Sequence, residues 1–169
     1  MFKVGDLAVY PAHGVGRIEA IEKRSVGGDE YTFYVMRILE NDMKILIPQS
    51  NAGQVGLRQL ISDQEIEKVF AILREKDVEF TPQTWNRRYR EYTERIKTGS
   101  IFDLAAVLRD LFLLQVEKPL SFGERKMMDT ARNLLVKEIS IAQHKNEEDV
   151  AAWIESVFKA SSVEGGLPA

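Results

Sequence analysis

The chain of 169 residues is 44% hydrophobic and 29% charged, and its net charge at pH 7 is −3. This composition is typical of a soluble globular protein with one or two small domains, and the acidic charge means that any nucleic-acid binding must be local. The absence of cysteine excludes disulfides and thiolate metal sites, and two histidines argue against a histidine metal site, so we expect neither a metal nor another cofactor.

The sequence shows no segment that would cross a membrane or direct secretion. No run of about 18 apolar residues occurs, and the N-terminal residues lack the apolar stretch of a signal peptide. We therefore expect a cytoplasmic protein that does not contact a membrane.

The first 61 residues predict a small all-β domain. Short runs rich in Val, Ile, Leu and Tyr occupy residues 7–10, 15–22, 31–39, 43–47 and 55–60. Turn-forming residues separate these runs, and Gly27-Gly28 and Asn41-Asp42 tolerate the positive φ angles of tight hairpins. Five short strands in about 60 residues fit a small antiparallel barrel.

Two features of this domain could suggest chemistry. Gly14-Val15-Gly16 could be taken for a phosphate loop, but a strand pattern follows it where such a loop requires a helix. His13 lies in a turn without a Ser or Cys nucleophile, so we interpret it as a turn residue.

From Ser62 the hydrophobic period becomes helical, which places a domain boundary between residues 61 and 62. Ser62 and Ser121 each open a capping box with the glutamate three residues later. Helices are predicted to begin at Ser62, Thr81, Ser100, Ser121 and Asn146. The predicted fold is segregated α+β: a β-barrel over residues 1–61, followed by a five-helix bundle over residues 62–169.

The helix that begins at Thr81, with Pro82 in its first turn and Gly99 after its end, is locally basic in an acidic chain. Residues 82–97 contain five Lys and Arg against two Glu, which gives +3 in an acidic chain. Trp85, Tyr89, Tyr92 and Ile96 recur on one face, and arginines flank them. Aromatic rings beside arginines can contact nucleic acid, but periodicity alone favours a core stripe with solvated arginines.

A second basic pair, Arg125 and Lys126, lies in the first turn of the helix predicted from Ser121. These cations are tolerated there if they are solvated, and they are useful there if they bind a phosphate. Trp153 lies in an acidic helix among aliphatic residues and is interpreted as core. No catalytic motif occurs, so we expect no catalytic residue and no enzyme activity.

Three segments resemble the CarD/CdnL family of bacterial RNA polymerase-binding transcription regulators. They are residues 2–16 (FKVGDLAVYPAHGVG), 85–89 (WNRRY) and 120–128 (LSFGERKMM). The first segment is also similar to the polymerase-interacting module of transcription-repair coupling translocases. All three segments occur in the order of the family, over nearly the whole chain.

The resemblance implies a Tudor-like barrel that docks on the RNA polymerase β subunit and a helical domain that contacts promoter DNA. It implies that Trp85 enters the minor groove at the upstream edge of the transcription bubble, and this favours an exposed Trp85. The implied contacts with the DNA backbone are Arg87, Arg88, Arg90, Arg125 and Lys126. The implied polymerase contacts are Arg24, Leu46, Ile47 and Pro48. Some family members carry a basic residue at the position of Leu46, so the contact in this chain is more apolar.

We therefore expect a non-enzymatic regulator that stabilises the open promoter complex with little DNA sequence specificity. We expect a monomer in the cytoplasm, associated with the nucleoid. The alternative is a protein-only adaptor, in which the barrel binds polymerase and the helices bind another protein. Salt-dependent DNA binding by residues 62–169 would argue against the adaptor.

Overall fold

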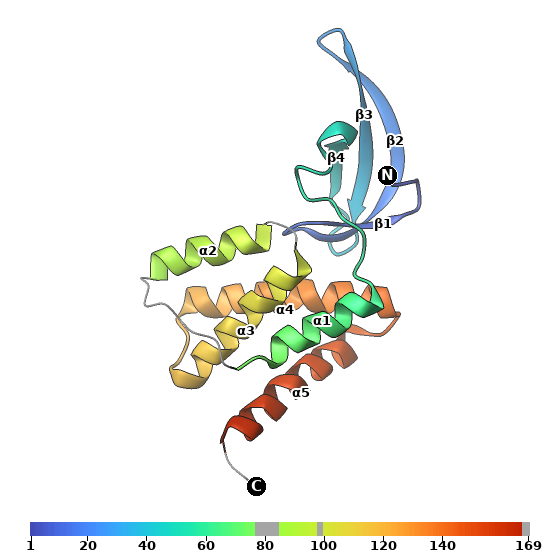
Figure 1. Cartoon of the computed structure of the whole chain (residues 1–169). Helices are drawn as coiled ribbons and strands as arrows, with labels where there is room; N and C mark the ends of the chain where they lie inside the picture. The colour runs from blue at the N-terminus through green and yellow to red at the C-terminus, as the bar shows by residue number, and fades with distance from the viewer. Residues whose placement is uncertain (77–84, 98–99, 167–169) are drawn as a thin grey trace. The chain divides into compact units, whose positions relative to one another are not determined.

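The computed structural model describes residues 1–76, 85–97 and 100–166, with only the backbone for Trp85 and residues 160–166 (Figure 1). Internal contacts divide the chain into two units, Met1–Leu60 and Ile61–Ala169, which are described separately below. Among the described residues, no helix is long and apolar enough to cross a membrane.

The first unit is a curled antiparallel sheet with the strand order β1-β2-β3-β4 (Figure 1). Its strands are β1 (Leu7–Tyr10), β2 (Gly14–Val26), β3 (Asp29–Ile38) and β4 (Lys44–Pro48). Gly27 and Gly28 join β2 to β3 with φ angles of 60° and 89°, so they form the predicted tight hairpin. His13 lies in the turn before β2, with its ring against Tyr10, as predicted.

Close packing explains why residue 16, which could have been taken for part of a phosphate loop, is a glycine. A Cβ atom on Gly16 would lie 2.5 Å from the Met36 side chain and 2.8 Å from the Arg37 carbonyl oxygen. Gly16 therefore allows β2 and β3 to approach each other over the core of the sheet. The side chains that fill this core include Ala8, Ile18, Tyr34, Met36, Ile38 and Ile47.

The predicted fifth strand, over residues 55–60, is wrong. The chain after β4 forms the 3-10 helix η1 (Gln49–Asn51) and then turns, and only Arg58 makes an isolated bridge to Val9. Gly56 has a φ of 81°, which breaks the extended backbone that a continuous strand requires. The sheet is therefore a half-barrel of four strands, and the predicted segregated α+β class is confirmed.

The described residues of the second unit form five helices, as predicted. They are α1 (Asp63–Arg74), α2 (Trp85–Lys97), α3 (Ile101–Glu117), α4 (Phe122–Gln143) and α5 (Glu147–Gly166). Both predicted capping boxes are present, at Ser62 and Ser121. The predicted cap at Thr81, the Pro82 position and the end at Gly99 lie outside the described residues.

Helix α3 lies at the centre of this unit and packs against α1, α2 and α4. Val107, Leu108 and Leu111 on α3 are completely buried in the core of the bundle. Trp153 on α5 packs against the same core, with its ring stacked 3.9 Å from that of Phe70, so the prediction that it is a core residue is confirmed.

Candidate functional site

The strand register separates the predicted polymerase contacts onto two faces of the half-barrel. Ile47 pairs with Tyr34 and is only 2% exposed, so its side chain belongs to the core. Leu46 and Pro48, its neighbours along β4, point to the opposite face because successive side chains of a strand alternate. Arg24 pairs with Tyr31 on β3 and lies on the same outer face as Leu46 by this alternation.

The outer face carries an apolar ridge that crosses two strands. Leu46 pairs with Val35, and Pro48 pairs with Phe33, so these four side chains lie in adjacent rows. We call Phe33, Val35, Leu46 and Pro48 the outer ridge. Leu46 is its most exposed member, at 43%. Val35 is only 7% exposed, and Phe33 and Pro48 are half-buried, so Leu46 supplies most of the exposed apolar surface of the ridge. An apolar side chain exposed in this way marks a candidate docking surface for a protein.

Ion pairs bound the outer ridge along the sheet. Arg24 pairs with Glu22 at 2.9 Å, and Arg37 donates a short hydrogen bond to Glu19. The hydrogen bond from Arg37 lowers the pKa of the Glu19 carboxyl group below its ordinary value. These charges form a polar rim around an apolar centre, which is the usual composition of protein interfaces.

Helix α2 divides its predicted aromatic stripe between the core and the solvent. Tyr92 is buried, and Ile96 packs against the core of the bundle, whereas Tyr89 is exposed. The Tyr92 hydroxyl donates a hydrogen bond of 3.4 Å to Asp110 on α3. Burial, together with the carboxylate of Asp110, raises the pKa of Tyr92 well above its ordinary value. The hydroxyl therefore stays protonated and continues to donate.

Two arginines of α2 reach acidic residues on neighbouring helices. Arg88 lies 3.8 Å from Glu124 on α4, and their side chains are only 14% and 9% exposed. Arg95 lies 3.7 Å from Asp103 and 3.8 Å from Asp110, both on α3. Arg88, Tyr92, Arg95 and Ile96 lie on the same side of the helix, and we call them the inner face of α2.

The other predicted DNA contacts on α2 point away from this inner face. The Arg87 side chain is exposed and lies 3.7 Å from Glu91, one turn along the helix. Arg90 is also exposed. The side chain of Trp85, the central residue of the prediction, lies outside the described part of the chain, so its contact with DNA stays a prediction.

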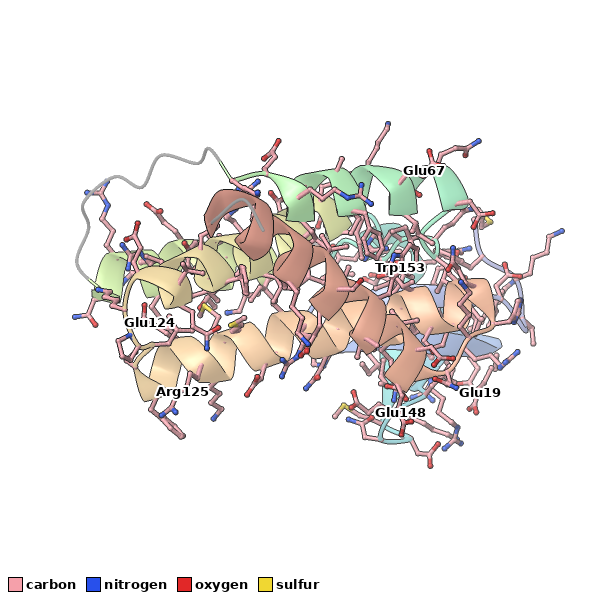
Figure 2. All side chains as sticks on the ribbon, turned by 90° about the horizontal axis from the view of Figure 1, so that it is seen from below. Glu19, Glu67, Glu124, Arg125, Glu148 and Trp153 are labelled. Atoms are coloured by element: carbon pink, nitrogen blue, oxygen red, sulfur yellow. The ribbon has the colours of Figure 1, made fainter. Side chains whose placement is uncertain are left out.

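The start of α4 presents the second basic pair to solvent. Arg125 and Lys126 are exposed, and Phe122 beside them is 75% exposed. In Figure 2, Glu124 points toward the neighbouring helices and Arg125 points away from them. Ser121 and Glu124 cap the first turn of the helix, so the basic side chains are its main means of contacting an anion.

Sequence reasoning did not single out the acidic partners that hold α2, or a buried cation beside them. Arg109 on α3 donates to Asp110 over 3.1 and 2.9 Å, and it also pairs with Glu75 after α1. The sequence signal for this cluster was the charged pair Arg109-Asp110 in the middle of the apolar helix α3, because charges that are buried are almost always paired. Among the described residues, no group of His, Asp and Glu could hold a metal ion.

Comparison with known proteins gives consistent matches along the chain. Residues 2–61 match the model of the CarD-like/TRCF RID domain, and residues 68–155 match that of the CarD C-terminal domain. The putative transcription factor YdeB of Bacillus subtilis (strain 168) is 32% identical over 154 residues, which cover 90% of this chain and 99% of that protein.

Two solved structures of isolated N-terminal domains are also similar to this chain. The 72-residue N-terminal domain of Myxococcus xanthus CarD is 36% identical, with a TM-score of 0.31, and the match covers 35% of this chain and 79% of that domain. The CdnL N-terminal domain from the same organism is 54% identical, with a TM-score of 0.33, and the match covers 37% of this chain and 89% of that domain.

Proposed function

Because this chain belongs to the CarD family of transcription regulators, we propose that it docks on the RNA polymerase β subunit and stabilises the open promoter complex. The observation that carries the proposal is the order of the two matched domains, an RID domain followed by a CarD C-terminal domain. The family consists of regulators and is not an enzyme family. In this proposal, the protein acts as a monomer on the DNA of the nucleoid and catalyses no reaction.

The outer ridge supports docking on polymerase by the first unit. Leu46 offers exposed apolar surface on β4, with the half-buried Pro48 on the same face, and the surrounding ion pairs can exclude the wrong partners. Arg24 lies on the same face and offers a cation at the rim of the contact. Ile47 supports the contact from below, since its side chain fills the core beneath β4.

The exposed cations support DNA contact by the second unit. Arg87 and Arg90 on α2 and Arg125 and Lys126 on α4 are exposed, in a chain whose net charge is −3. Cations that bind phosphates position a protein on DNA without reading its sequence. In the proposal, the Trp85 ring wedges into the minor groove at the upstream edge of the bubble.

Stabilisation of the open complex requires different affinities for open and closed DNA. A wedge costs a few kcal/mol of unstacking in intact duplex, and it costs less where one side of the base step is already unpaired. Binding that favours open DNA shifts the equilibrium by that difference. Docking on polymerase raises the local concentration of the second unit, so an acidic protein with a modest DNA affinity can act.

The test combines polymerase capture with promoter opening by the full chain. We expect the wild type to bind polymerase and to lengthen the lifetime of open complexes. Leu46→Glu places a charge on the outer ridge and should weaken both effects. Met43→Glu is the matched control, because Met43 is a similar side chain that is 45% exposed outside the ridge, against 43% for Leu46.

Three outcomes would count against the proposal or part of it. A wild-type chain that captures no polymerase contradicts the whole proposal. Equal effects of Leu46→Glu and Met43→Glu contradict the assignment of the outer ridge. Polymerase capture without any salt-dependent DNA binding or any change in promoter opening would favour the protein-only adaptor.

A further inference from the structure

Few apolar contacts attach the described side chains of α2 to the bundle. Among the described side chains of α2, Tyr92 is the one that is fully buried in the core, and Ile96 is partly buried. Arg88 and Arg95 join the inner face to acidic residues: Arg88 lies near Glu124, and Arg95 lies near Asp103 and Asp110. Among the described side chains of α2, these ion pairs therefore contribute to positioning the helix together with Tyr92 and Ile96.

Glu124 differs from the acidic partners on α3 because it also completes the capping box of the helix that carries it. Its Oε1 atom accepts a hydrogen bond of 3.0 Å from the Ser121 backbone N–H, which completes the capping box of α4. Its Oε2 atom lies 3.8 Å from Nη1 of Arg88 on α2. A single buried carboxylate thus joins the first turn of α4 to α2.

We propose that Glu124 is a positioning residue, which holds α2 so that its exposed arginines and the Arg125–Lys126 pair of α4 form one DNA-binding surface. The proposal rests on the proposed DNA contact and adds a role for a residue that does not touch DNA. In Figure 2, Glu124 points toward the neighbouring helices while Arg125 points away from them. In the proposal, Glu124 therefore positions α2, and Arg125 contacts the DNA. Arg88 then acts mainly through Glu124.

The direction in which DNA affinity changes when the charge of Glu124 is removed separates a positioning role from a purely electrostatic one. Removing a negative charge beside a basic surface should strengthen DNA binding, because less repulsion opposes the phosphates. If Glu124 positions α2, removing its charge should weaken DNA binding even though the chain becomes less acidic. The two interpretations therefore predict opposite changes in affinity.

Glu124→Gln is a suitable variant because glutamine also serves in a capping box. It keeps an acceptor for the Ser121 N–H and removes the charge that pairs with Arg88. Glu65→Gln is the matched control, since Glu65 occupies the equivalent capping-box position of α1, with Ser62. Among the described residues, Glu65 forms no ion pair with a cation, so the control changes the same charge in the same motif.

Amide hydrogen exchange of the full chain without DNA measures the docking of α2 directly. We expect Glu124→Gln to raise exchange several-fold in residues 86–97 and to leave α1 and α3 protected. Binding to a forked DNA duplex, measured at two salt concentrations, should weaken several-fold in Glu124→Gln. In Glu65→Gln, exchange of α2 should stay unchanged and DNA affinity should stay unchanged or rise slightly.

The outcomes distinguish a failure of this inference from a failure of the proposed function. Unchanged α2 exchange with unchanged or stronger DNA binding in Glu124→Gln overturns the positioning role. A wild type that does not bind the forked duplex overturns the DNA contact and, with it, the shared surface, whatever the exchange shows. If Glu124→Gln lacks a cooperative melting transition, amide hydrogen exchange of α2 is measured in Arg88→Met instead. This variant removes the same ion pair and keeps the capping box of α4. Unchanged α2 protection in Arg88→Met then overturns the inference.

Discussion

Helices α2 and α3 lie side by side and are held in the bundle by different forces. Helix α3 buries aliphatic side chains along most of its length, including Leu104, Val107, Leu108 and Leu111. Among the described side chains of α2, Tyr92 is buried and Ile96 is partly buried, while Arg88 and Arg95 pair with acidic residues of α3 and α4. Burial of apolar surface stabilises by about 25 cal/mol per Å², whereas exposed ion pairs contribute about 0–1 kcal/mol each, and in buried ion pairs desolvation offsets much of the attraction.

The difference teaches that the candidate DNA-binding helix is the more loosely attached of the two. Elements with few buried apolar contacts open at lower free energy than the core that supports them. Helix α2 can therefore adjust to a nucleic acid without loss of the bundle, while α3 keeps the position of the acidic partners. Substitutions on the two helices should have correspondingly different effects on stability.

The largest expected effect comes from truncating the core of α3. Leu108 is completely buried in α3, so Leu108→Ala should lower the free energy of unfolding by about 2–5 kcal/mol. Ile96→Ala on α2 removes a partly buried side chain and should cost about 1 kcal/mol or less. Chemical denaturation of both variants measures the two losses. Equal losses would show that α2 belongs to the same cooperative core as α3.

The second prediction concerns Trp85 at the start of α2. In the proposed function its ring acts on open DNA, so Trp85→Ala should remove most of the open-complex stabilisation. This stabilisation is at most the few kcal/mol of unstacking that the ring avoids at a base step that is already open. Folding and capture of polymerase should remain intact. Promoter opening with purified polymerase, measured beside thermal melting, checks both statements.

If Trp85 is instead buried, Trp85→Ala should reduce stability more than it reduces promoter opening. Truncation of a buried tryptophan costs about 3–5 kcal/mol of stability, so a large fall in melting temperature with normal promoter opening would contradict the DNA-facing role. Trp153→Ala provides the comparison, because its ring stacks on Phe70 in the core. It should destabilise the bundle and should affect opening only through unfolding.

Local features of the fold were predictable from the sequence. The capping boxes at Ser62 and Ser121 and the Gly27-Gly28 hairpin depend on neighbours within a few residues, and all three form as predicted. The absence of the predicted fifth strand could not be foreseen from the apolar run at residues 55–60, because the positive φ of Gly56 is a property of the folded chain. Short apolar runs beside a glycine remain ambiguous for this reason.

The candidate site was predictable only in its residue types. The cations of α2 and α4 were evident, but the partners of Arg88 and Arg95 come from other helices, and periodicity does not reveal such pairings. The strand alternation that places Ile47 in the core and Leu46 outside follows from the register with β3. Which member of an apolar run faces the core depends on that register.

The smallest expected effect on stability concerns Arg125 and Lys126 at the start of α4. Both are exposed, and the described residues give neither an ion pair, so replacing both by alanine should leave stability nearly unchanged. If each binds a phosphate, the double variant should weaken binding to all DNA sequences alike. It should also reduce the salt dependence of log K by about one unit for each lost contact.

Lys68 and Arg74 on α1 give a matched control for this double variant. Both are exposed, so replacing them by alanine changes the net charge by the same amount on a helix that carries no predicted DNA contact. Long-range charge alone would weaken DNA binding equally in the two double variants, because it depends on net charge more than on position. A reduced salt slope in Arg125→Ala/Lys126→Ala but not in Lys68→Ala/Arg74→Ala would therefore locate phosphate contacts at the start of α4. Equal slopes would mean that this helix start is merely solvated and that the DNA contact belongs to α2 alone.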